Sequence, residues 1–243
     1  MNTHGKVALI TGSAKRIGRE TAVALARRGA TIAVHYRSSK EEAWETLRLV
    51  REAGSQGAVF SADLGDIEQI PVLIRDVEAA LGGIDILVNN ASVFAPGTVE
   101  DATSADWDDQ MNANAKAPFL VAQRAAQSML RRGGGKIVNL VDAAGEIIWP
   151  GYFPYSVSKA ALIAVSRGMA KAYAPLIQVN GVAPGPVLFP EYYTEEQKRA
   201  AVDRTLLKRP GSPADVVSAI VFLIENDYIT GEIIHVDGGR HAI

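Results

Sequence analysis

The sequence predicts an α/β fold in which a seven-stranded parallel sheet is doubly wound, with helices on both of its faces. Short runs rich in β-branched residues alternate along the chain with longer stretches of helical periodicity. The runs at Val7–Ile10 and Ile84–Val88 are almost continuously apolar, as strands are when helices cover both faces of a sheet. The 243 residues contain no repeat, low-complexity tract or linker, so we expect one domain, residues 1–243.

Seven short runs are the expected strands. They are Lys6–Thr11, Thr31–Tyr36, Ala58–Ser61, Ile84–Asn89, Lys136–Val141, Gln178–Val182 and Ile233–Val236. The intervening helices are expected to begin near Arg16, Ser39, Ile67, Ser104, Phe153 and Pro213. A regular succession of strand and helix is typical of a single-domain Rossmann fold, which binds ligands at the carboxyl ends of its strands.

Several expected helices carry recognisable end signals. Gly29 and Gly54 each follow a helical stretch, where glycine readily takes the left-handed conformation that ends a helix. Ser212 precedes Pro213, which is the order of a serine cap and a proline in the first turn.

The least regular part of the chain lies at about residues 184–210. Its prolines are Pro184, Pro186, Pro190 and Pro210. One short helix is expected within it, near Glu195–Val202. Inside a compact domain so long an excursion is more often a lid over a site than a structural loop, so we expect a substrate lid here.

Charge and cysteine content exclude several classes of protein. There are 25 Lys and Arg against 27 Asp and Glu, and the net charge of −2 gives no general reason to bind nucleic acid or an anionic membrane. Without cysteine there is no disulfide framework, no thiolate zinc site and no cysteine nucleophile, and we expect no metal. The N-terminal apolar run is too short for a signal peptide and no stretch is long enough to cross a membrane, so we expect a cytoplasmic protein.

The first turn after a strand has the composition of a phosphate-binding turn. It reads Thr11-Gly12-Ser13-Ala14-Lys15-Arg16-Ile17-Gly18 and leads into the first helix. Such a turn directs backbone N–H groups and a helix N-terminus at a pyrophosphate, and small residues permit close approach. The alternative is a strand-to-helix turn that needs glycine only for steric reasons.

The end of the second strand indicates which dinucleotide binds. An acidic residue there would bind a ribose 2′-hydroxyl, but the chain reads His35-Tyr36-Arg37-Ser38. Arg37 and Ser38 can bind a 2′-phosphate, and Lys15 and Arg16 add positive charge, so we expect NADP or NADPH rather than NAD. The alternative is that Arg37 is an ordinary solvated loop residue.

The ordered motifs of the chain resemble those of the short-chain dehydrogenase/reductase family. They are Thr11-Gly12-x-x-x-Arg16-Ile17-Gly18, Asp63-Leu64, Asn89-Asn90-Ala91-Ser92, Tyr155-x-x-x-Lys159, Val179-Asn180-x-Val182-x-Pro184-Gly185 and Val236-Asp237-Gly238-Gly239. Arg16 replaces the middle glycine of most members. In this, and in His35-Tyr36-Arg37-Ser38, the sequence is similar to the pteridine reductase branch.

The resemblance implies a set of cofactor-binding residues along the whole chain. Asp63 and Leu64 would flank the adenine, while Asn90 and Ala91 would run beside a ribose. The full expected set is Gly12, Lys15, Arg16, Ile17, Gly18, His35, Tyr36, Arg37, Ser38, Asp63, Leu64, Asn90, Ala91, Ser92, Tyr155, Lys159, Pro184 and Gly185.

Tyr155 and Lys159 are the expected catalytic pair. They lie four residues apart and therefore on one face of a helix. A tyrosine normally titrates near pH ~10, and the lysine charge would lower that pKa. The resemblance assigns Asn114 to a proton relay that holds a water near the lysine, with Asn112 as a rival. The alternative for Asn114 is a polar contact to backbone that bends its helix.

Asp142 determines the expected chemistry. Most of the family carries a serine at this position, thirteen residues before the tyrosine, where it stabilises the oxygen of a carbonyl substrate. An ionised carboxylate would oppose a developing alkoxide, which disfavours simple ketone reduction. An Asp with a raised pKa could instead donate or relay a proton to the nitrogen of a C=N bond. The alternative is a capping or salt-bridging residue in an inactive or differently specialised relative.

Other residues are expected to shape the substrate pocket. The pteridine reductases carry an aromatic residue at the place of Phe94, where it would stack on a flat bicyclic substrate; alternatively, Phe94 is a hydrophobic loop anchor. The expected substrate-binding residues are Arg16, Ser92, Phe94, Asp142 and Tyr155. The lid aromatics Phe189, Tyr192 and Tyr193 could close the pocket or simply pack. In this branch a C-terminal tail can enter a neighbouring subunit's site, which makes Arg240 a candidate.

Three functions remain open from the sequence. The first is an NADPH-dependent reductase of pterin or dihydropterin rings, with dihydrofolate as a further candidate substrate. In it hydride passes to a ring carbon and Tyr155 with Asp142 delivers the proton. The second is a carbonyl reductase, for example of 3-oxoacyl substrates, and the third is an NADP-binding regulatory protein without turnover. The resemblance also implies a homotetramer built through helices near Ser104–Leu130 and Phe153–Ala174.

Overall fold

The computed structural model describes every residue from Met1 to Ile243 and has one sheet of seven parallel strands. The strands are β1 (Val7–Ile10), β2 (Thr31–Tyr36), β3 (Gly57–Ser61), β4 (Ile86–Asn89), β5 (Gly135–Leu140), β6 (Ile177–Pro184) and β7 (Ile233–Val236). Their spatial order is β3-β2-β1-β4-β5-β6-β7, and every neighbouring pair is parallel. The predicted fold class is confirmed.

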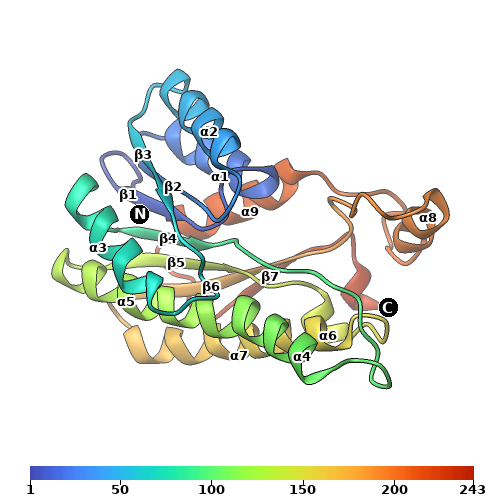
Figure 1. Cartoon of the computed structure of the whole chain (residues 1–243). Coiled ribbons are helices and arrows are strands. Elements are labelled where there is room, and N and C mark those ends of the chain that lie inside the picture. The colour runs from blue at the N-terminus through green and yellow to red at the C-terminus, as the bar shows by residue number, and fades with distance from the viewer.

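Helices cover both faces of this sheet. They are α1 (Arg16–Ala26), α2 (Lys40–Glu52), α3 (Gln69–Leu81), α4 (Ser104–Met111), α5 (Ala117–Arg131), α6 (Ala144–Ile147), α7 (Phe153–Tyr173), α8 (Glu195–Asp203) and α9 (Pro213–Glu225). In Figure 1, α1, α2 and α9 lie on one face, and α3, α5 and α7 lie on the other. No helix is both long and apolar enough to span a membrane.

The strand order locates the binding region. β1 is bonded to β2 on one side and to β4 on the other, so the winding of the chain reverses at β1. In open α/β sheets ligands bind in the crevice beyond the carboxyl ends of the strands at such a reversal. The loops after β1 and β4, which carry Gly12 and Asn90, therefore border this crevice.

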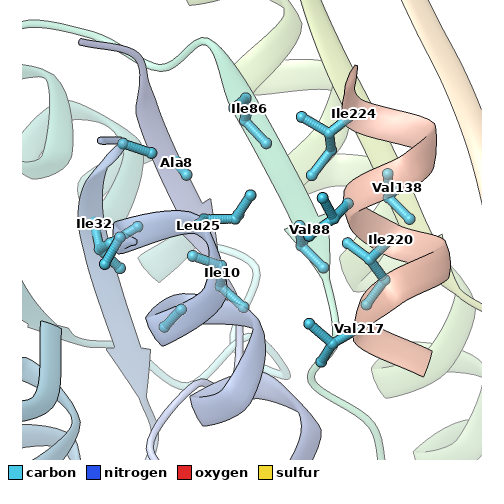
Figure 2. Close-up of a cluster of buried hydrophobic side chains, with 14 of the residues drawn as sticks. Ala8, Ile10, Leu25, Ile32, Ile86, Val88, Val138, Val217, Ile220 and Ile224 are labelled. Carbon is cyan, nitrogen blue, oxygen red and sulfur yellow. The ribbon is translucent and has the colours of Figure 1, made fainter. Parts of the chain in front are cut away.

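The core explains why a strand such as β1 is continuously apolar. Ala8 and Ile10 of β1 pack under α1 and α9 together with Leu25 and Ile220, as Figure 2 shows. Leu9, between them, points to the opposite face and belongs to the second core under α3, α5 and α7. Alternate residues of one strand thus enter two different cores, and neither face of the strand tolerates a polar side chain.

Element boundaries differ from the sequence predictions by a few residues, and two features were missed. The four-residue helix α6 is too short to show a periodicity. The stretch expected as one helix from Ser104 onward is interrupted by a π-helical turn, Asn112–Lys116, between α4 and α5. The cap at Ser212 is confirmed, because its hydroxyl accepts the Asp215 amide while the Asp215 carboxylate accepts the Ser212 amide. Gly29 and Gly54 have the expected positive φ angles, 81° and 86°.

Candidate active site

A single large cleft of about 1850 Å³ lies at the carboxyl ends of the strands. Its walls come from the β1–α1 turn, the loops after β2 to β6, helix α7, the segment at residues 184–204 and the C-terminal tail. A pocket for one drug-sized ligand has a volume of ~300–1,000 Å³, so this cleft has room for a dinucleotide and a second molecule beside it.

The cleft brings together most of the residues that the sequence singled out. Those that line it are Gly12, Lys15, Arg16, Ile17, His35, Tyr36, Arg37, Ser38, Asp63, Leu64, Asn90, Ala91, Ser92, Phe94, Asp142, Tyr155, Lys159, Pro184 and Gly185. Gly18 and Asn114 do not line it, whereas Asn112 does. The two residues outside the wall act on the site through packing and hydrogen bonds.

His35 holds the turn that begins at Gly12 through a hydrogen bond to its backbone. Its Nδ1 accepts a hydrogen bond from the Gly12 amide (3.0 Å), so Nε2 carries the proton and donates to the Ala62 carbonyl (3.1 Å). Burial lowers the pKa of His35 to about 4 despite the bond to Ala62, which keeps the ring neutral near pH 7. His35 thus orients the turn through both ring nitrogens, and neither nitrogen is free to meet a phosphate in this structure.

Gly18 allows α1 to approach the loop after β4. A Cβ at this position would come within 2.6 Å of Asn90 Nδ2 and of the Gly12 carbonyl oxygen. That Nδ2 donates to the carbonyls of Thr11 and Gly12, at 2.8 and 3.0 Å. Thr11 Oγ1 accepts the amides of Asn90 and Ala91, both at 3.0 Å. The two loops are therefore held together at backbone distance, as a cradle for a flat or phosphorylated ligand requires.

The basic group at the end of β2 is smaller than expected. Lys15 forms an ion pair with Glu42 of α2 (2.6 Å), which neutralises a charge that the sequence assigned to the cofactor phosphates. Arg37 is exposed at the cleft and has no ion pair or side-chain hydrogen bond within the chain. Arg37 is thus the cation at this end that remains available for a phosphate.

Arg16 takes a backbone conformation that disfavours side chains. Its φ is +54°, in the left-handed region where most of the family has the glycine that Arg16 replaces. The guanidinium Nη2 donates to the Leu188 carbonyl (3.1 Å), which links the phosphate turn to the segment at residues 184–210. Arg16 lines the cleft, but in this structure it is bonded to that segment.

The left-handed conformation of Arg16 predicts that a glycine variant is more stable than an alanine variant, the reverse of the usual order in a helix. We expect Arg16→Gly to unfold with a free energy about 1 kcal/mol higher than Arg16→Ala, because only glycine escapes the left-handed cost. In an ordinary helix alanine is the more stable by about the same amount. Urea unfolding of the two variants measures the difference, and both lose the same bond to Leu188. A more stable Arg16→Ala would show that residue 16 does not hold a left-handed conformation in the folded protein.

Tyr155 and Asp142 meet in the wall of the cleft. The Tyr155 hydroxyl donates to Asp142 Oδ2 (2.8 Å), and Asp142 Oδ1 accepts the Ala144 amide (2.8 Å). Lys159, one turn after Tyr155 on α7, donates from Nζ to the Leu140 carbonyl (2.9 Å) and lies 5.7 Å from the tyrosine ring centroid. The three side chains therefore form one coupled acid–base group.

Burial sets the titration of this group. It raises the pKa of Asp142, although the Ala144 amide and the Lys159 charge oppose the change. It lowers the pKa of Lys159 to about 8, against the attraction of Asp142. The pKa of Tyr155 is raised well above its usual value by burial and by the Asp142 charge. The lowering of the Tyr155 pKa expected from Lys159 is thus reversed here, because burial and, after it, the Asp142 carboxylate bonded to the hydroxyl both raise this pKa.

Asn114 connects the loop after β4 to helix α7. It sits fully buried in the π-helical turn, and its Nδ2 donates to the Val93 carbonyl (3.0 Å) and to Ser158 Oγ (3.1 Å). Its Oδ1 accepts the Ser92 hydroxyl (2.8 Å) and the Val93 amide (2.9 Å). The Asn114 side chain makes no hydrogen bond to Lys159, so its part in a proton relay remains a prediction.

Aromatic rings line the cleft beside Tyr155. Phe94 stacks on Tyr152, with centroids 4.3 Å apart and planes 10° apart, and meets Tyr155 edge to face at 4.7 Å. Tyr152 therefore occupies one face of Phe94, and stacking of a substrate on Phe94 stays a prediction. Tyr152 also accepts a hydrogen bond from the Tyr193 hydroxyl (3.0 Å). The sequence reasoning missed Tyr152 and Trp149, although the aromatic residues crowded between Asp142 and Tyr155 were a usable signal.

Comparisons with known proteins agree with this geometry. The sequence model of the family described as "Enoyl-(Acyl carrier protein) reductase" matches residues 12–241. A 3-oxoacyl-[acyl-carrier-protein] reductase of Staphylococcus aureus is 33% identical over 241 residues, covering 97% of this chain and 98% of its own.

Two solved structures extend the comparison. The angucycline C-6 ketoreductase LanV with bound NADP superposes with a TM-score of 0.93 at 32% identity, covering 100% of this chain and 98% of LanV. FolM alternative dihydrofolate reductase 1 of Brucella canis, complexed with NADP, gives a TM-score of 0.91 at 31% identity, covering 100% and 97%. The chain belongs to the short-chain dehydrogenase/reductase family.

Proposed function

We propose that the protein is an NADPH-dependent reductase of pterin or dihydropterin rings, with dihydrofolate as a further candidate substrate. The observation that carries the proposal is the hydrogen bond between Tyr155 and Asp142, at a position where most of the family has serine. Burial raises the pKa of Asp142, which favours the protonated carboxyl that the proposed proton delivery requires. A buried proton donor suits a C=N bond, whose nitrogen must gain a proton as its carbon is reduced.

The cleft fits the dinucleotide on two counts. Gly12 has a φ of +64°, and a Cβ there would lie 3.0 Å from Ala91 Cα, so the turn leaves its backbone bare. Arg37 offers an unpaired guanidinium where a 2′-phosphate would lie. The relatives LanV and FolM were crystallised with NADP, which supports the same cofactor here. When bound, NADPH supplies the hydride.

The side chains of the active site have separate tasks in this proposal. Tyr155 donates the proton to the substrate nitrogen, and Asp142 replenishes it through their shared hydrogen bond. The positive charge of Lys159 opposes the rise in the pKa of Asp142 that burial causes. Asp142 therefore stays acidic enough to return a proton to Tyr155. Asn114 holds Ser158 and Val93, and so the helix and loop on which these groups stand.

Carbonyl reduction is the second candidate. The Staphylococcus aureus relative and LanV are named for reducing carbonyl groups, which supports it. In that reaction protonated Asp142 would serve as the second donor to the substrate oxygen, beside Tyr155. The two candidates use the same cleft and differ in the atom that receives the proton.

One substrate panel separates the candidates. The purified protein is given NADPH with dihydrobiopterin, dihydrofolate, a quinonoid dihydropterin or a 3-oxoacyl thioester, and the loss of NADPH is followed. Turnover of a pterin supports the proposal, whereas turnover of the thioester alone replaces it with carbonyl reduction. Tight NADPH binding without turnover on any compound favours a regulatory protein, although Tyr155 and Lys159 are both present.

Arg37 is expected to set the preference for NADPH. We expect Arg37→Ala to raise KM for NADPH by about 10- to 100-fold, because the variant loses a charge-assisted pair of hydrogen bonds to the 2′-phosphate. KM for NADH should stay unchanged, since NADH lacks that phosphate. The matched control is Arg51→Ala, an exposed arginine of α2 outside the cleft. Initial rates with each cofactor provide the measurement. Equal catalytic efficiency with NADH in the unsubstituted protein would refute the role of Arg37.

Two further proposals concern larger parts of the molecule. We propose that residues 184–210 act as a lid, since α8 stands away from the sheet and Arg16 bonds to Leu188 (Figure 1).

We also propose a homotetramer through α4, α5 and α7, because Trp107, Phe119 and Leu130 are exposed apolar side chains on α4 and α5. Light scattering distinguishes a tetramer from a 25.9 kDa monomer.

A further inference from the structure

The C-terminal tail folds back over the chain's own cleft. After β7 the backbone turns through Gly238 and Gly239, with φ of +66° and +81°, into a short 3₁₀ turn, Arg240–Ala242. The Asp237 carboxylate accepts the amide of Gly239 (2.9 Å) and the amide and ring Nδ1 of His241 (2.8 and 2.9 Å). One buried carboxylate thus fixes the residues on both sides of Arg240.

A second contact secures this tail. The ring of His241 stacks on His235, with centroids 3.9 Å apart and planes 21° apart. His235 Nε2 lies 2.8 Å from Glu146 Oε2 on α6. The tail is thereby tied to β7 and to the helix that follows Asp142, so the position of Arg240 is determined by structured elements on both sides.

The Arg240 side chain lines the cleft without a hydrogen-bonding or ion-pair partner in the chain. The residue is only 9% exposed, lines the cleft, and stacks its guanidinium on Trp149 with Cζ 4.7 Å from the ring centroid. Its side chain makes no hydrogen bond, and no carboxylate lies within 4.0 Å of its nitrogens. Both oxygens of nearby Asp142 are already bonded, to Tyr155 and Ala144. The N–H donors of this guanidinium therefore have no acceptor within the chain and, at the wall of the cleft, are available to an anionic ligand.

A second arginine reinforces the unmet positive charge. Arg204, at the end of α8, lines the same cleft and has neither an ion pair nor a side-chain hydrogen bond. Burial lowers the pKa of Arg240, and repulsion from Arg204 acts in the same direction. Asp142 opposes that change without forming an ion pair. Neither arginine has an ion-pair partner within the chain, so both guanidinium groups are available to an anionic ligand in the cleft.

We propose that Arg240, with Arg204 at the rim, forms an oxyanion-binding subsite, and that the substrate of this enzyme carries a carboxylate beside its reducible ring. The inference rests on the proposed function, because it assigns this part of the cleft to the substrate. The planar guanidinium suits a carboxylate bidentately, and Trp149 beneath it holds the fork in place. Arg37 is the cation assigned to the cofactor, so the two charged sites have different ligands.

The test compares two pterins that differ only in the substituent on the ring, a carboxylate in one and a neutral hydroxymethyl group in the other. Pterin-6-carboxylate and 6-hydroxymethylpterin are titrated calorimetrically into the NADP⁺-saturated protein. We expect the carboxylate to bind at least ~tenfold more tightly, as one bidentate charged pair provides. Arg240→Gln should abolish the preference and Arg240→Lys should retain part of it, which also shows that the position tolerates substitution. The control is Arg199→Gln, which removes the same charge from α8 outside the cleft and should keep the full preference.

A second ligand pair separates failure of the subsite from failure of the pterin proposal. The pair is 4-carboxybenzaldehyde and 4-formylbenzamide, which share a ring and a carbonyl group. If neither pterin binds but an Arg240-dependent preference for the carboxylated aldehyde appears, the subsite stands and the pterin function is wrong. If pterins bind with equal affinity in both forms, or the preference survives in Arg240→Gln, the subsite is overturned.

Discussion

Replacing Asp142 with serine is expected to lower kcat for a pterin substrate by about 100-fold or more, with the affinity for NADPH nearly unchanged. The physical reason is the proton. Asp142 is bonded to the Tyr155 hydroxyl at 2.8 Å, and burial raises its pKa, so the pair can supply a proton to a ring nitrogen. Serine preserves a polar contact with Tyr155 but has no proton to release near neutral pH. Single-turnover oxidation of bound NADPH measures the step directly.

A ketone substrate provides the internal control for this substitution. Asp142→Ser restores the donor that the family uses at a carbonyl oxygen, so the rate on a 3-oxoacyl thioester should rise while the pterin rate falls. Opposite changes on two substrates exclude a simple loss of folding. A serine variant as active as the unsubstituted protein on pterins would show that Asp142 has no part in proton delivery.

The pH dependence follows from the same group. Asp142 donates only while it is protonated, and its raised pKa extends that range upward from the ordinary carboxyl range. The pterin rate should therefore fall as pH rises through the pKa of Asp142, and this decline should be missing from the residual rate of Asp142→Ser. Lys159, with a pKa of about 8, adds a second decline at higher pH.

The fold was predictable because its main determinants are local and repeated. A strand such as β1 must be apolar at every position, since Ala8 and Leu9 enter cores on opposite faces of the sheet. That requirement is visible in the sequence without any knowledge of partners. The π-helical turn at Asn112–Lys116 was not visible, because one extra residue in a helical turn does not alter the residue pattern enough to show.

The site was predictable in its residues but not in their contacts. Most of the expected site residues line one cleft, yet Lys15 pairs with Glu42, and Tyr155 is bonded to Asp142. Each contact joins two segments that are apart in the sequence, and only the folded structure shows that they touch. Burial of Tyr155, together with the Asp142 charge, raises the pKa that Lys159 was expected to lower, and the sequence states neither the burial nor the contact. Arg240 was a candidate from the sequence because such a tail can enter a neighbouring subunit's site, whereas in the structure it lies over Trp149 of its own chain.

Lys159→Met is expected to reduce turnover by about 100-fold or more and to make the fold more stable. The ammonium is buried, and its hydrogen bond to the Leu140 carbonyl compensates only part of that burial. Burial lowers the lysine pKa from 10.5 to about 8, so the folded state holds this charge at a cost. Methionine fills a similar volume without charge, and we expect the free energy of unfolding to rise by about 1–2 kcal/mol below pH 8.

The gain in stability must depend on pH in one direction. Below pH 8 both folded and unfolded chains carry a charged Lys159, and the full cost of burial applies. Between about pH 8 and 10.5 the folded chain loses the proton first, so the unsubstituted protein becomes relatively more stable as pH rises and the advantage of methionine shrinks. Lys171→Met, an exposed lysine on the same helix, should change neither turnover nor this pH dependence. A stability gain that stayed constant from pH 7 to pH 10 would show that Lys159 is not held as a buried charge, and its role beside Asp142 would have to be sought in packing instead.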